Sequence, residues 1–316
     1  LVSSWLPALD GVVPRLEAAL LEGKEHLLHL VSWTETEQPA AVLAGIAGAA
    51  ATGTIAVNDD LWSVFLLRLQ QALPGARWVE AAPLLRPLRM HKDAAEIATM
   101  AEVARRTDET WEEFIRQPVA GLTEVQARAR LEAALVARGV TPAFCIVASG
   151  PNSASPHHNA GERVIQAGDA LVVDWGGTLG GYYSDVTRSA HVGPPSAEYE
   201  AAYAAVLAAN EIAFAAVRPG VPCEEIDRAA RDYLTVNGYG EAFFHRVGHG
   251  LGLAVHEEPY LVAGNDLPLA EGMTFSDEPG VYFPGKFGIR IEDTVVVTAN
   301  GGEKLTHATR ALTMLT

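Results

Sequence analysis

Residues 170–188, ALVVDWGGTLGGYYSDVTR, contain an apolar segment that ends at Asp174, a glycine-rich reversal, and a second segment that begins near Asp185. This pattern predicts a β-hairpin. With the reversal centred between Leu179 and Gly180, the two aspartates face each other, with β-carbons ~5 Å apart. Two carboxylates that close repel each other, so the pair either has a raised pKa or binds a cation. Because aspartate near a glycine-rich reversal is also common as a turn residue, a purely local structural role stays open at this point.

Two later segments also place acids in or at the end of strands. In residues 273–280, MTFSDEPG, Glu278 ends a strand-like segment, and the Pro-Gly that follows terminates pairing. In residues 288–298, GIRIEDTVVVT, the alternation puts Arg290 and Glu292 on the same face of one strand. An acid within a strand is disfavoured unless it is paired, and pairing of Glu292 with Arg290 or with a lysine would meet that requirement.

Three of the chain's ten histidines, His245, His249 and His256, lie within twelve residues, in FHRVGHGLGLAVHE. The first two have the spacing of a helical zinc site, but the glycines between them disfavour a helix, and the glutamate of HExxH is absent. Either the histidines are incidental loop residues, or the glycines allow the backbone to approach a ligand closely. The GxGxG pattern is a weak dinucleotide signal, because no helix opens after it.

Four carboxylates and one imidazole thus lie at strand ends or glycine-rich turns of one region: Asp174, Asp185, His249, Glu278 and Glu292. An oxygen-rich set with one nitrogen suits two divalent metal ions, with Mn favoured and Co, Fe or Zn as alternatives. Two ions ~3.5–4 Å apart can share a bridging hydroxide that acts as the nucleophile, while they polarise a carbonyl group. This set predicts metal-dependent hydrolysis.

The length of 316 residues predicts two domains, 1–88 and 89–316, with a junction at Pro83, Pro87 and the basic residues that follow. The first domain mixes helix and strand signals, which predicts a small α/β domain. We expect helices over 12–21 and 61–73, the second capped by residues 58–60, and strands over 27–33, 54–57 and 76–81.

In the second domain the order helix, helix, strands occurs twice, which predicts an α+β domain built from two similar halves. We expect the helices over 94–116, 123–138, 196–217 and 222–237, with Asp93 and Thr123 as N-caps of the first two. A strand over 144–148 leads into a polar loop, 149–159, that is rich in turn formers. A long loop of this kind inside a compact domain often carries function.

Composition excludes several classes of function. A formal charge of −16, from 23 basic and 39 acidic residues, disfavours a nucleic-acid partner. The longest nearly uncharged stretch, 38–58, is broken by Pro39, so we expect buried or loop structure there and no membrane span. Cys145 and Cys223 form no disulfide framework, which suits a reducing cytoplasm. No secretory signal is visible, and a start on Leu1 leaves a trimmed N-terminus open.

The chain from about residue 89 to its end resembles the pita-bread metallopeptidases, which comprise methionine aminopeptidase, aminopeptidase P, prolidase and the metal-free creatinase. The resemblance rests on five motifs in the order of that superfamily: SGPNSASPHH, VVDWGGTLGGYYSDVTR, HRVGHGLGLAVHE, DEPGVYFPG and GIRIEDTVVV. It implies a pita-bread catalytic domain whose two halves are related by an approximate twofold axis. It also implies a homodimer in which the N-terminal domain of one chain lies near the active site of the other.

By resemblance, Asp174 binds one metal ion, Asp185 and Glu292 bridge both ions, and His249 and Glu278 bind the other. All five ligands are present. Their presence argues against creatinase and against relatives that keep this fold as a metal-free interaction module. Such a module is the non-enzyme alternative.

The residues that match the proline-specific branch of the superfamily are His157, His245, His256 and Arg290. By resemblance, Glu278 also accepts a proton from the bridging water, His157 and His256 assist with the substrate carbonyl and the leaving group, and His245 and Arg290 bind substrate. His158 has no clear counterpart, so the choice of His157 rests on the proline that precedes it.

The resemblance therefore implies a dinuclear metal-dependent Xaa-Pro dipeptidase, or prolidase, that acts on dipeptides with a C-terminal proline. The alternative is aminopeptidase P, which acts on longer Xaa-Pro-Xaa peptides, because the N-terminal domain is shorter than usual in this branch. The bond before proline is a tertiary amide of restricted geometry, so a dedicated enzyme must orient the imide nitrogen. Metal ions together with a general acid meet that need.

Overall fold

The computed structural model describes residue 31 and residues 33–316. The helix expected over 12–21 lies outside the described residues, as does nearly all of the strand expected over 27–33. The chain divides into two compact units, Leu1–Leu85 and Arg86–Thr316. Within the described residues, none of the helices has both the length and the apolar character needed to cross a bilayer.

The first unit contains a parallel strand pair joined by a helix. β1 (Thr54–Val57) pairs with β2 (Arg77–Glu80), and α3 (Ser63–Ala72) connects them. The N-cap of α3 is Trp62, so the capping expected from residues 58–60 is wrong. Residues 38–58 also differ from expectation, because they form α2 (Pro39–Ile46), which buries no residue, and a 3-10 turn, η2 (Gly48–Thr52). Alanine and leucine favour a helix even where packing does not require one.

The expected proline junction is itself helical. α4 (Ala82–Met90) contains both prolines, with Pro87 inside the helix. Pro83 lies in the first turn, where the missing N–H costs little. The division between the two units falls within this helix.

The second unit has two helix pairs whose bounds match the predictions to within two residues. The pairs are α5 (Ala94–Phe114) with α6 (Glu124–Ala137), and α7 (Ala197–Ala216) with α8 (Cys223–Val236). Asp93 and Thr123 each cap their helix in a reciprocal capping box with the third helical residue. Each box satisfies two backbone N–H groups that a helix start would otherwise leave free.

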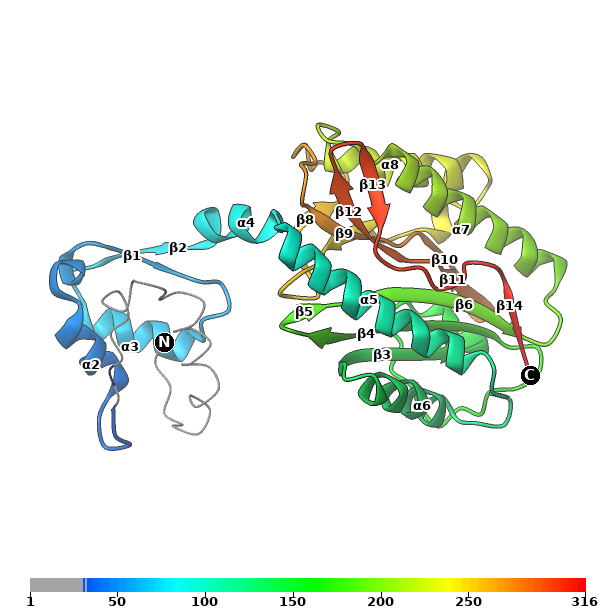
Figure 1. The fold of residues 1–316 in the computed structure, drawn as a ribbon, viewed down its shortest axis with the longest axis horizontal. Helices are drawn as coiled ribbons and strands as arrows, with labels where there is room; N and C mark the ends of the chain where they lie inside the picture. Colours follow the sequence, from blue (N-terminus) through cyan, green and yellow to red (C-terminus); the bar gives the residue numbers. More distant parts are fainter. Residues whose placement is uncertain (1–30, 32) are drawn as a thin grey trace. The chain divides into compact units, whose positions relative to one another are not determined.

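Each helix pair accompanies one sheet (Figure 1). The first sheet has the order β14-β6-β4-β3, with β5 added to β4, and its strands are β3 (Thr141–Ser149), β4 (Ala170–Leu179), β5 (Tyr182–Tyr183), β6 (Val186–Val192) and β14 (Thr313–Leu315). The second has the order β13-β12-β9-β7-β8, with β7 (Gly248–Gly250), β8 (Glu257–Leu261), β9 (Thr274–Asp277), β12 (Asp293–Thr298) and β13 (Gly301–Lys304). β10 (Gly280–Phe283) and β11 (Phe287–Arg290) form an antiparallel pair, and η3 (Gly150–Ala154) and η4 (Gly240–Ala242) are short 3-10 turns.

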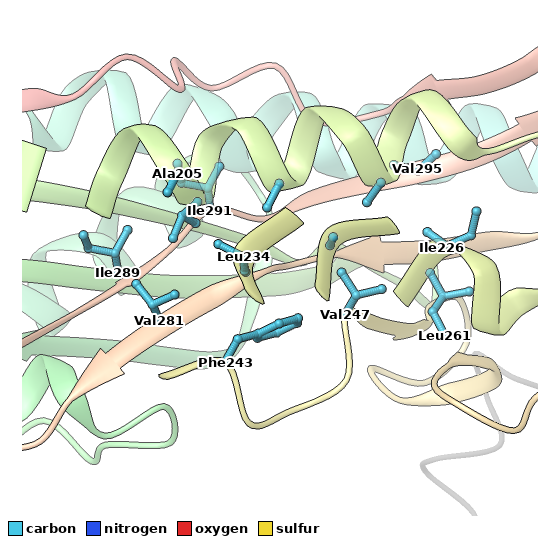
Figure 2. Packing of buried hydrophobic residues seen from close by; sticks show 14 of the residues in the cluster. Ala205, Ile226, Leu234, Phe243, Val247, Leu261, Val281, Ile289, Ile291 and Val295 are labelled. Carbon is cyan, nitrogen blue, oxygen red and sulfur yellow. The ribbon is translucent and has the colours of Figure 1, made fainter. Parts of the chain in front are cut away.

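Apolar side chains fill the space between each sheet and its helices. Figure 2 shows Ile226 and Leu234 of α8 in one core with Val281 and Ile289 of β10 and β11. A second core joins α5 and α6 to alternate residues of β4, namely Leu171, Val173 and Trp175. Burying a side chain of this size contributes about 1.5–3 kcal/mol. Because strand side chains alternate, Asp174 lies on the face of β4 opposite to this core.

The register of the hairpin differs from the one expected. Asp174 lies opposite Thr187, so the prediction that it lies opposite Asp185 is wrong. Gly180 and Gly181 have φ angles of 60° and 91°, the left-handed values that a two-residue type I′ turn requires at both central positions. The reversal is therefore centred between these glycines, one residue later than expected, and the partner of Asp174 moves by two residues.

The strand expected over 288–298 is interrupted. β11 ends at Arg290, β12 begins at Asp293, and Glu292 lies in the break. The backbone N–H of Glu292 donates to the carbonyl oxygen of Thr187 at 3.1 Å, in an isolated bridge between the two. This bridge joins the two halves of the unit at the point where their acidic residues meet.

Candidate active site

A cavity of about 940 Å³ lies in the second unit and is lined by segments of both halves. Nine of its lining residues are the ones singled out from the sequence: His157, Asp174, Asp185, His245, His249, His256, Glu278, Arg290 and Glu292. The structure therefore brings together all the sequence-predicted site residues.

The candidate metal ligands converge from separate segments. Asp185 follows β5, His249 is the middle residue of β7, and Glu292 lies between β11 and β12. One ligand atom from each of these three buried residues lies within 4.8 Å of the other two. His249 Nε2 is 3.5 Å from Asp185 Oδ2 and 3.3 Å from Glu278 Oε1. Asp174 lines the same cavity from β4.

Hydrogen bonding fixes the state of His249. Its Nδ1 lies 3.0 Å from the carbonyl oxygen of Gly250, which can only accept, so Nδ1 carries the proton. Burial, followed by the charge of His256, lowers the pKa of His249 to about 3, so the ring is neutral near pH 7. The unprotonated Nε2 thus presents a lone pair to the carboxylates, as a metal-ligating histidine does.

The carboxylates are crowded and poorly satisfied. Burial, followed by the neighbouring charges, raises the pKa of Asp185 and that of Glu292 well above their ordinary values. Burial likewise raises the pKa of Glu278 to about 7. Asp174 Oδ1 is buried without a hydrogen-bond partner among the described residues. A buried acceptor in that state is costly, and a divalent cation between the acids would both pair it and offset the repulsion.

The donor set therefore fits divalent metal ions. Four carboxylates with one neutral imidazole provide hard oxygen ligands and a single nitrogen, which suit Mn and similar first-row ions. The alternative expectation, in which Glu292 is simply paired with Arg290, is not what the structure shows. Glu292 Oε2 instead accepts a hydrogen bond from Thr187 Oγ1 at 2.6 Å.

Arg290 has most of its donors engaged by the protein. Nη2 donates to Asp174 Oδ2 at 2.6 Å, Nη1 to the Tyr282 hydroxyl at 2.9 Å, and Nε to Thr187 Oγ1 at 3.1 Å. Nη1 also donates to the carbonyl oxygen of Pro156 at 3.2 Å. Arg290 thereby ties the loop before His157 to the carboxylate side of the site, and its predicted contact with substrate stays a prediction.

Hydrogen bonding fixes the tautomer of His245, as it does that of His249. Its Nδ1 lies 2.7 Å from the carbonyl oxygen of Arg246 and therefore carries the proton. Its Nε2 then accepts from the Tyr282 hydroxyl at 3.1 Å. Burial lowers the pKa of His245 to about 4, so this ring is neutral as well. His256 lies edge-on to His249, with ring centroids 4.1 Å apart, on the exposed wall of the cavity.

The two adjacent histidines of the polar loop have different surroundings. His158 Nε2 lies 2.7 Å from Glu124 Oε2, at the start of α6. The same buried carboxylate accepts from the N–H and hydroxyl of Ser149, from Asn152 Nδ2 and from the N–H of Gly161. Glu124 thus holds both ends of the loop, and His157 is left exposed on the cavity wall. His158 also lines the cavity, but its ring is held by Glu124, so His157 stays the predicted residue that faces substrate.

The glycines around His249 serve strand packing. A β-carbon at Gly248 would lie 1.8 Å from the carbonyl oxygen of Ser276, and one at Gly250 would lie 2.3 Å from that of Glu258. No side chain fits at either position without moving backbone. The sequence suggested that these glycines admit a ligand, whereas they admit the neighbouring strands that hold His249 in place.

Several residues that shape the site were missed from the sequence: Glu124, Thr187, Arg246, Ser276 and Tyr282. Thr187 had a usable signal, because it lies two residues beyond Asp185 in the same strand-like segment, and such residues share a face. Ser276 and Arg246 had local signals too, because Ser276 lies two residues before Glu278 and Arg246 directly follows His245. Glu124 and Tyr282 reach the site through contacts distant in sequence, for which no local pattern exists.

Comparison with known proteins places the chain in a family. The model of metallopeptidase family M24 matches residues 98–299. The probable dipeptidase PepE of Mycobacterium tuberculosis strain H37Rv is 42% identical over 315 residues, which cover 97% of this chain and 84% of that protein. The prolidase from Thermococcus sibiricus has a TM-score of 0.88 at 37% identity, covering 95% of this chain and 83% of its own.

An X-Pro aminopeptidase from Thermotoga maritima MSB8 has a TM-score of 0.81 at 35% identity, covering 90% of this chain and 82% of its own. These likenesses confirm the expected α+β pita-bread architecture and the expected metallopeptidase class. The chain belongs to metallopeptidase family M24.

Proposed function

We propose that this protein is an Xaa-Pro dipeptidase, which hydrolyses dipeptides whose second residue is proline. The observation that carries the proposal is the convergence of four carboxylates and the neutral His249 on one cavity that is also lined by His157, His245 and His256. Relatives named dipeptidase and prolidase, at 42% and 37% identity, support the same activity.

The proposed metal ligands are Asp174, Asp185, His249, Glu278 and Glu292, which would hold two divalent ions, with Mn favoured over Co, Fe or Zn. When bound, such ions supply a Lewis acid for the substrate carbonyl and lower the pKa of the attacking water. The protein's own part is to bring the carboxylates together and to hold His249 in the tautomer whose Nε2 is free.

The remaining residues are proposed to move protons and hold the peptide. Glu278 accepts a hydrogen bond from Ser276 Oγ at 3.1 Å, which orients the carboxylate that takes the proton of the attacking water. His157 and His256 line the cavity. They are proposed to assist with the substrate carbonyl and the leaving imide nitrogen. His245 and Arg290 are proposed to bind substrate, with the Tyr282 hydroxyl between them.

Peptide length decides between this proposal and its alternative, an aminopeptidase P that removes the first residue from longer Xaa-Pro-Xaa peptides. The likeness to an X-Pro aminopeptidase at 35% identity keeps that alternative in view. The test compares turnover of Ala-Pro and Ala-Pro-Ala by the Mn-loaded protein. We expect faster cleavage of Ala-Pro, and loss of activity in excess chelator. Faster cleavage of the tripeptide would show that the protein is an aminopeptidase P and not a dipeptidase. Full activity in chelator would refute both metal-dependent activities.

Two further expectations accompany this function. Both cysteines are free thiols, which supports a reducing, cytoplasmic location. The family resemblance supports a homodimer, which light scattering at assay concentrations would test.

A further inference from the structure

Among the described residues, three arginines line the cavity: Arg128, Arg246 and Arg290. Two of them already have a charged partner. Arg290 donates to Asp174 at 2.6 Å, and Arg128 Nε lies 3.6 Å from Glu132 Oε1.

Arg246 is different from the other two. Its side chain forms no hydrogen bond and no ion pair with any residue that the structure describes, whereas Arg128 has Glu132 nearby. The Nε atoms of Arg246 and Arg128 are both buried without a hydrogen-bond partner among these residues. The guanidinium instead stacks over the ring of Tyr260 in β8, at 4.7 Å from the centroid. A stacked guanidinium is held in place by its flat face, so its N–H groups stay available for a planar, bidentate partner.

Arg246 also lies close to the proposed chemistry. It precedes β7 by two residues and follows His245 directly. Its positive charge contributes to lowering the pKa of His249, of His256 and of Glu278, behind the larger effect of burial, which lowers the first two and raises the third. A free cation in a cavity this rich in acids is unusual, because carboxylates within reach normally pair with it.

A dipeptide brings its own carboxylate to this place. Consecutive Cα atoms across a trans peptide bond are about 3.8 Å apart, so the α-carboxylate of a dipeptide lies within a few ångströms of the scissile carbonyl. A longer peptide has a neutral amide at that position. A cation beside the metal ligands and His256 therefore distinguishes a free C-terminus from a continuing chain.

We propose that Arg246 binds the α-carboxylate of the leaving residue and so restricts the site to dipeptides. This inference rests on the proposed peptidase function and adds its length-determining residue. Guanidinium and carboxylate form two parallel charge-assisted hydrogen bonds, which an amide cannot reproduce. The preference for acid over amide thus depends on the Arg246 side chain.

The test measures kcat/KM for Ala-Pro and for Ala-Pro-amide with the metal-loaded wild type and with Arg246→Met and Arg246→Lys. Methionine keeps most of the apolar contact with Tyr260 and removes the charge. For Arg246→Met we expect kcat/KM for Ala-Pro to fall roughly 10- to 100-fold, while the value for the amide changes little, because charge-assisted hydrogen bonds are lost only with the acid. For Arg246→Lys, the kcat/KM for Ala-Pro should lie between that of the wild type and that of Arg246→Met. Arg228→Met, at an exposed position of α8, is the matched control and should keep the wild-type ratio.

Equal loss for acid and amide in Arg246→Met would overturn the inference, as would an unchanged ratio. A collapse of the ratio in Arg128→Met in place of Arg246→Met would also overturn it. If the wild type cleaves Ala-Ala and not Ala-Pro, the proposed proline specificity fails. The role of Arg246 is then tested by the ratio of kcat/KM for Ala-Ala to kcat/KM for Ala-Ala-amide, and an equal ratio in wild type and Arg246→Met would overturn the inference. If it cleaves neither, calorimetric binding of Ala-Pro against Ala-Pro-amide decides, and equal affinity in wild type and Arg246→Met would overturn the inference.

Discussion

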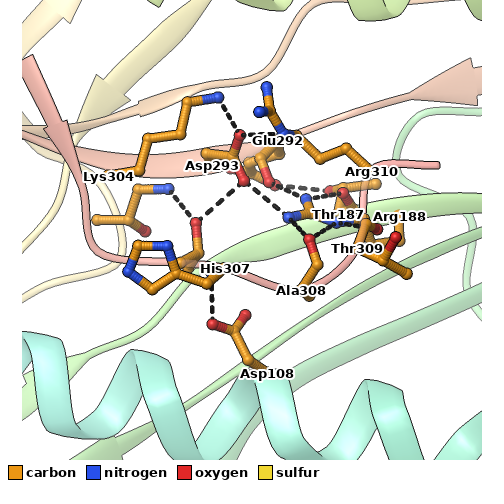
Figure 3. A network of polar contacts seen from close by, with 12 residues as sticks. Asp108, Thr187, Arg188, Glu292, Asp293, Lys304, His307, Ala308, Thr309 and Arg310 are labelled. Atoms are coloured by element: carbon orange, nitrogen blue, oxygen red, sulfur yellow. Dashed lines mark hydrogen bonds and ion pairs between the residues drawn. The ribbon is translucent and has the colours of Figure 1, made fainter.

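Arg188 Nη2 lies 2.7 Å from Asp293 Oδ1, in an ion pair whose two side chains are 1% and 0% exposed (Figure 3). The same guanidinium donates to the backbone carbonyl oxygens of Thr187 and Glu292. Burial alone would raise the pKa of Asp293, but the charges of Arg188 and Lys304 outweigh it and hold that pKa below its ordinary value. The ion pair therefore holds the backbone of Thr187 and Glu292, whose side chains form a buried hydrogen bond at the cavity wall that Glu292 lines.

Removing one partner of this pair should be strongly destabilising. In Asp293→Asn, Arg188 and Lys304 keep their charges but lose the buried carboxylate that pairs with both, and such a loss costs about 3–5 kcal/mol. We expect a correspondingly lower urea midpoint and a weaker affinity for Mn²⁺, because Glu292 loses its support. Glu198→Gln, which breaks the exposed ion pair with Lys286, is the control and should leave both quantities unchanged. An Asp293→Asn protein as stable as the wild type would contradict this reading of the network.

The Glu124 carboxylate offers a second test, because it orders the loop of His157 without lining the cavity itself. In Glu124→Gln, one carboxylate oxygen becomes an NH₂ group, which cannot accept from the donors that meet there. We expect stability to fall by about 1–3 kcal/mol, as for an unsatisfied buried group, and kcat/KM to fall while metal content stays at the wild-type value. Glu113→Gln, on the exposed side of α5, is the control. An unaltered kcat/KM in Glu124→Gln would show that the order of the His157 loop does not contribute to catalysis.

Metal uptake should release protons from carboxylates and none from His249. The pKa of Glu278 is raised to about 7, whereas that of His249 is lowered to about 3. Metal ligands must be deprotonated, so at pH 6 Glu278 gives up a proton on binding while His249 has none to give. Calorimetric titration with Mn²⁺ in two buffers of different ionisation enthalpy counts these protons. We expect net release at pH 6 that declines above pH 7. Identical heats in both buffers at pH 6 would show that the carboxylates are already ionised.

Local signals explain why much of the second unit could be predicted. Asp93 and Thr123 are side-chain caps, so the starts of α5 and α6 are encoded within three or four residues. The acids at strand ends were recognisable for the same reason. That they form one metal-binding set was inferred from their residue types, and the resemblance added which of them would bind each ion, since no local pattern specifies which strand ends face each other.

The hairpin register and the strand over 288–298 were predicted wrongly for two reasons. Either two local interpretations of the sequence were nearly equivalent, or contacts distant in sequence determine the structure. Gly180 and Gly181 both accept a left-handed φ, so the glycine run alone admitted more than one turn centre. The break at Glu292 follows from its bridge to Thr187, which is 105 residues away. Whether an arginine is engaged, as Arg290 is, also depends on partners that only the fold supplies.

Asp185 should show a conflict between stability and metal binding. Its buried carboxylate lies beside Asp174 and Glu278, and its pKa is raised well above the ordinary value of 3.8. An acid whose folded pKa is raised destabilises the fold increasingly as pH rises from its unfolded pKa toward its folded pKa. Asp185→Asn removes this effect, so the chelated variant should be more stable than the chelated wild type at pH 7.5 by about 0.5–2 kcal/mol, and much less so at pH 4.

With Mn²⁺ added, the order should reverse. The wild type gains stability because the ions bind only the folded state, whereas Asp185→Asn lacks a ligand and gains less. Melting temperatures with and without chelator at both pH values, together with metal content and Ala-Pro turnover, measure the two effects in one set of samples. We expect nearly complete loss of turnover in the variant. A variant that kept wild-type metal content and turnover would remove Asp185 from the metal site, even if its chelated form were the more stable one.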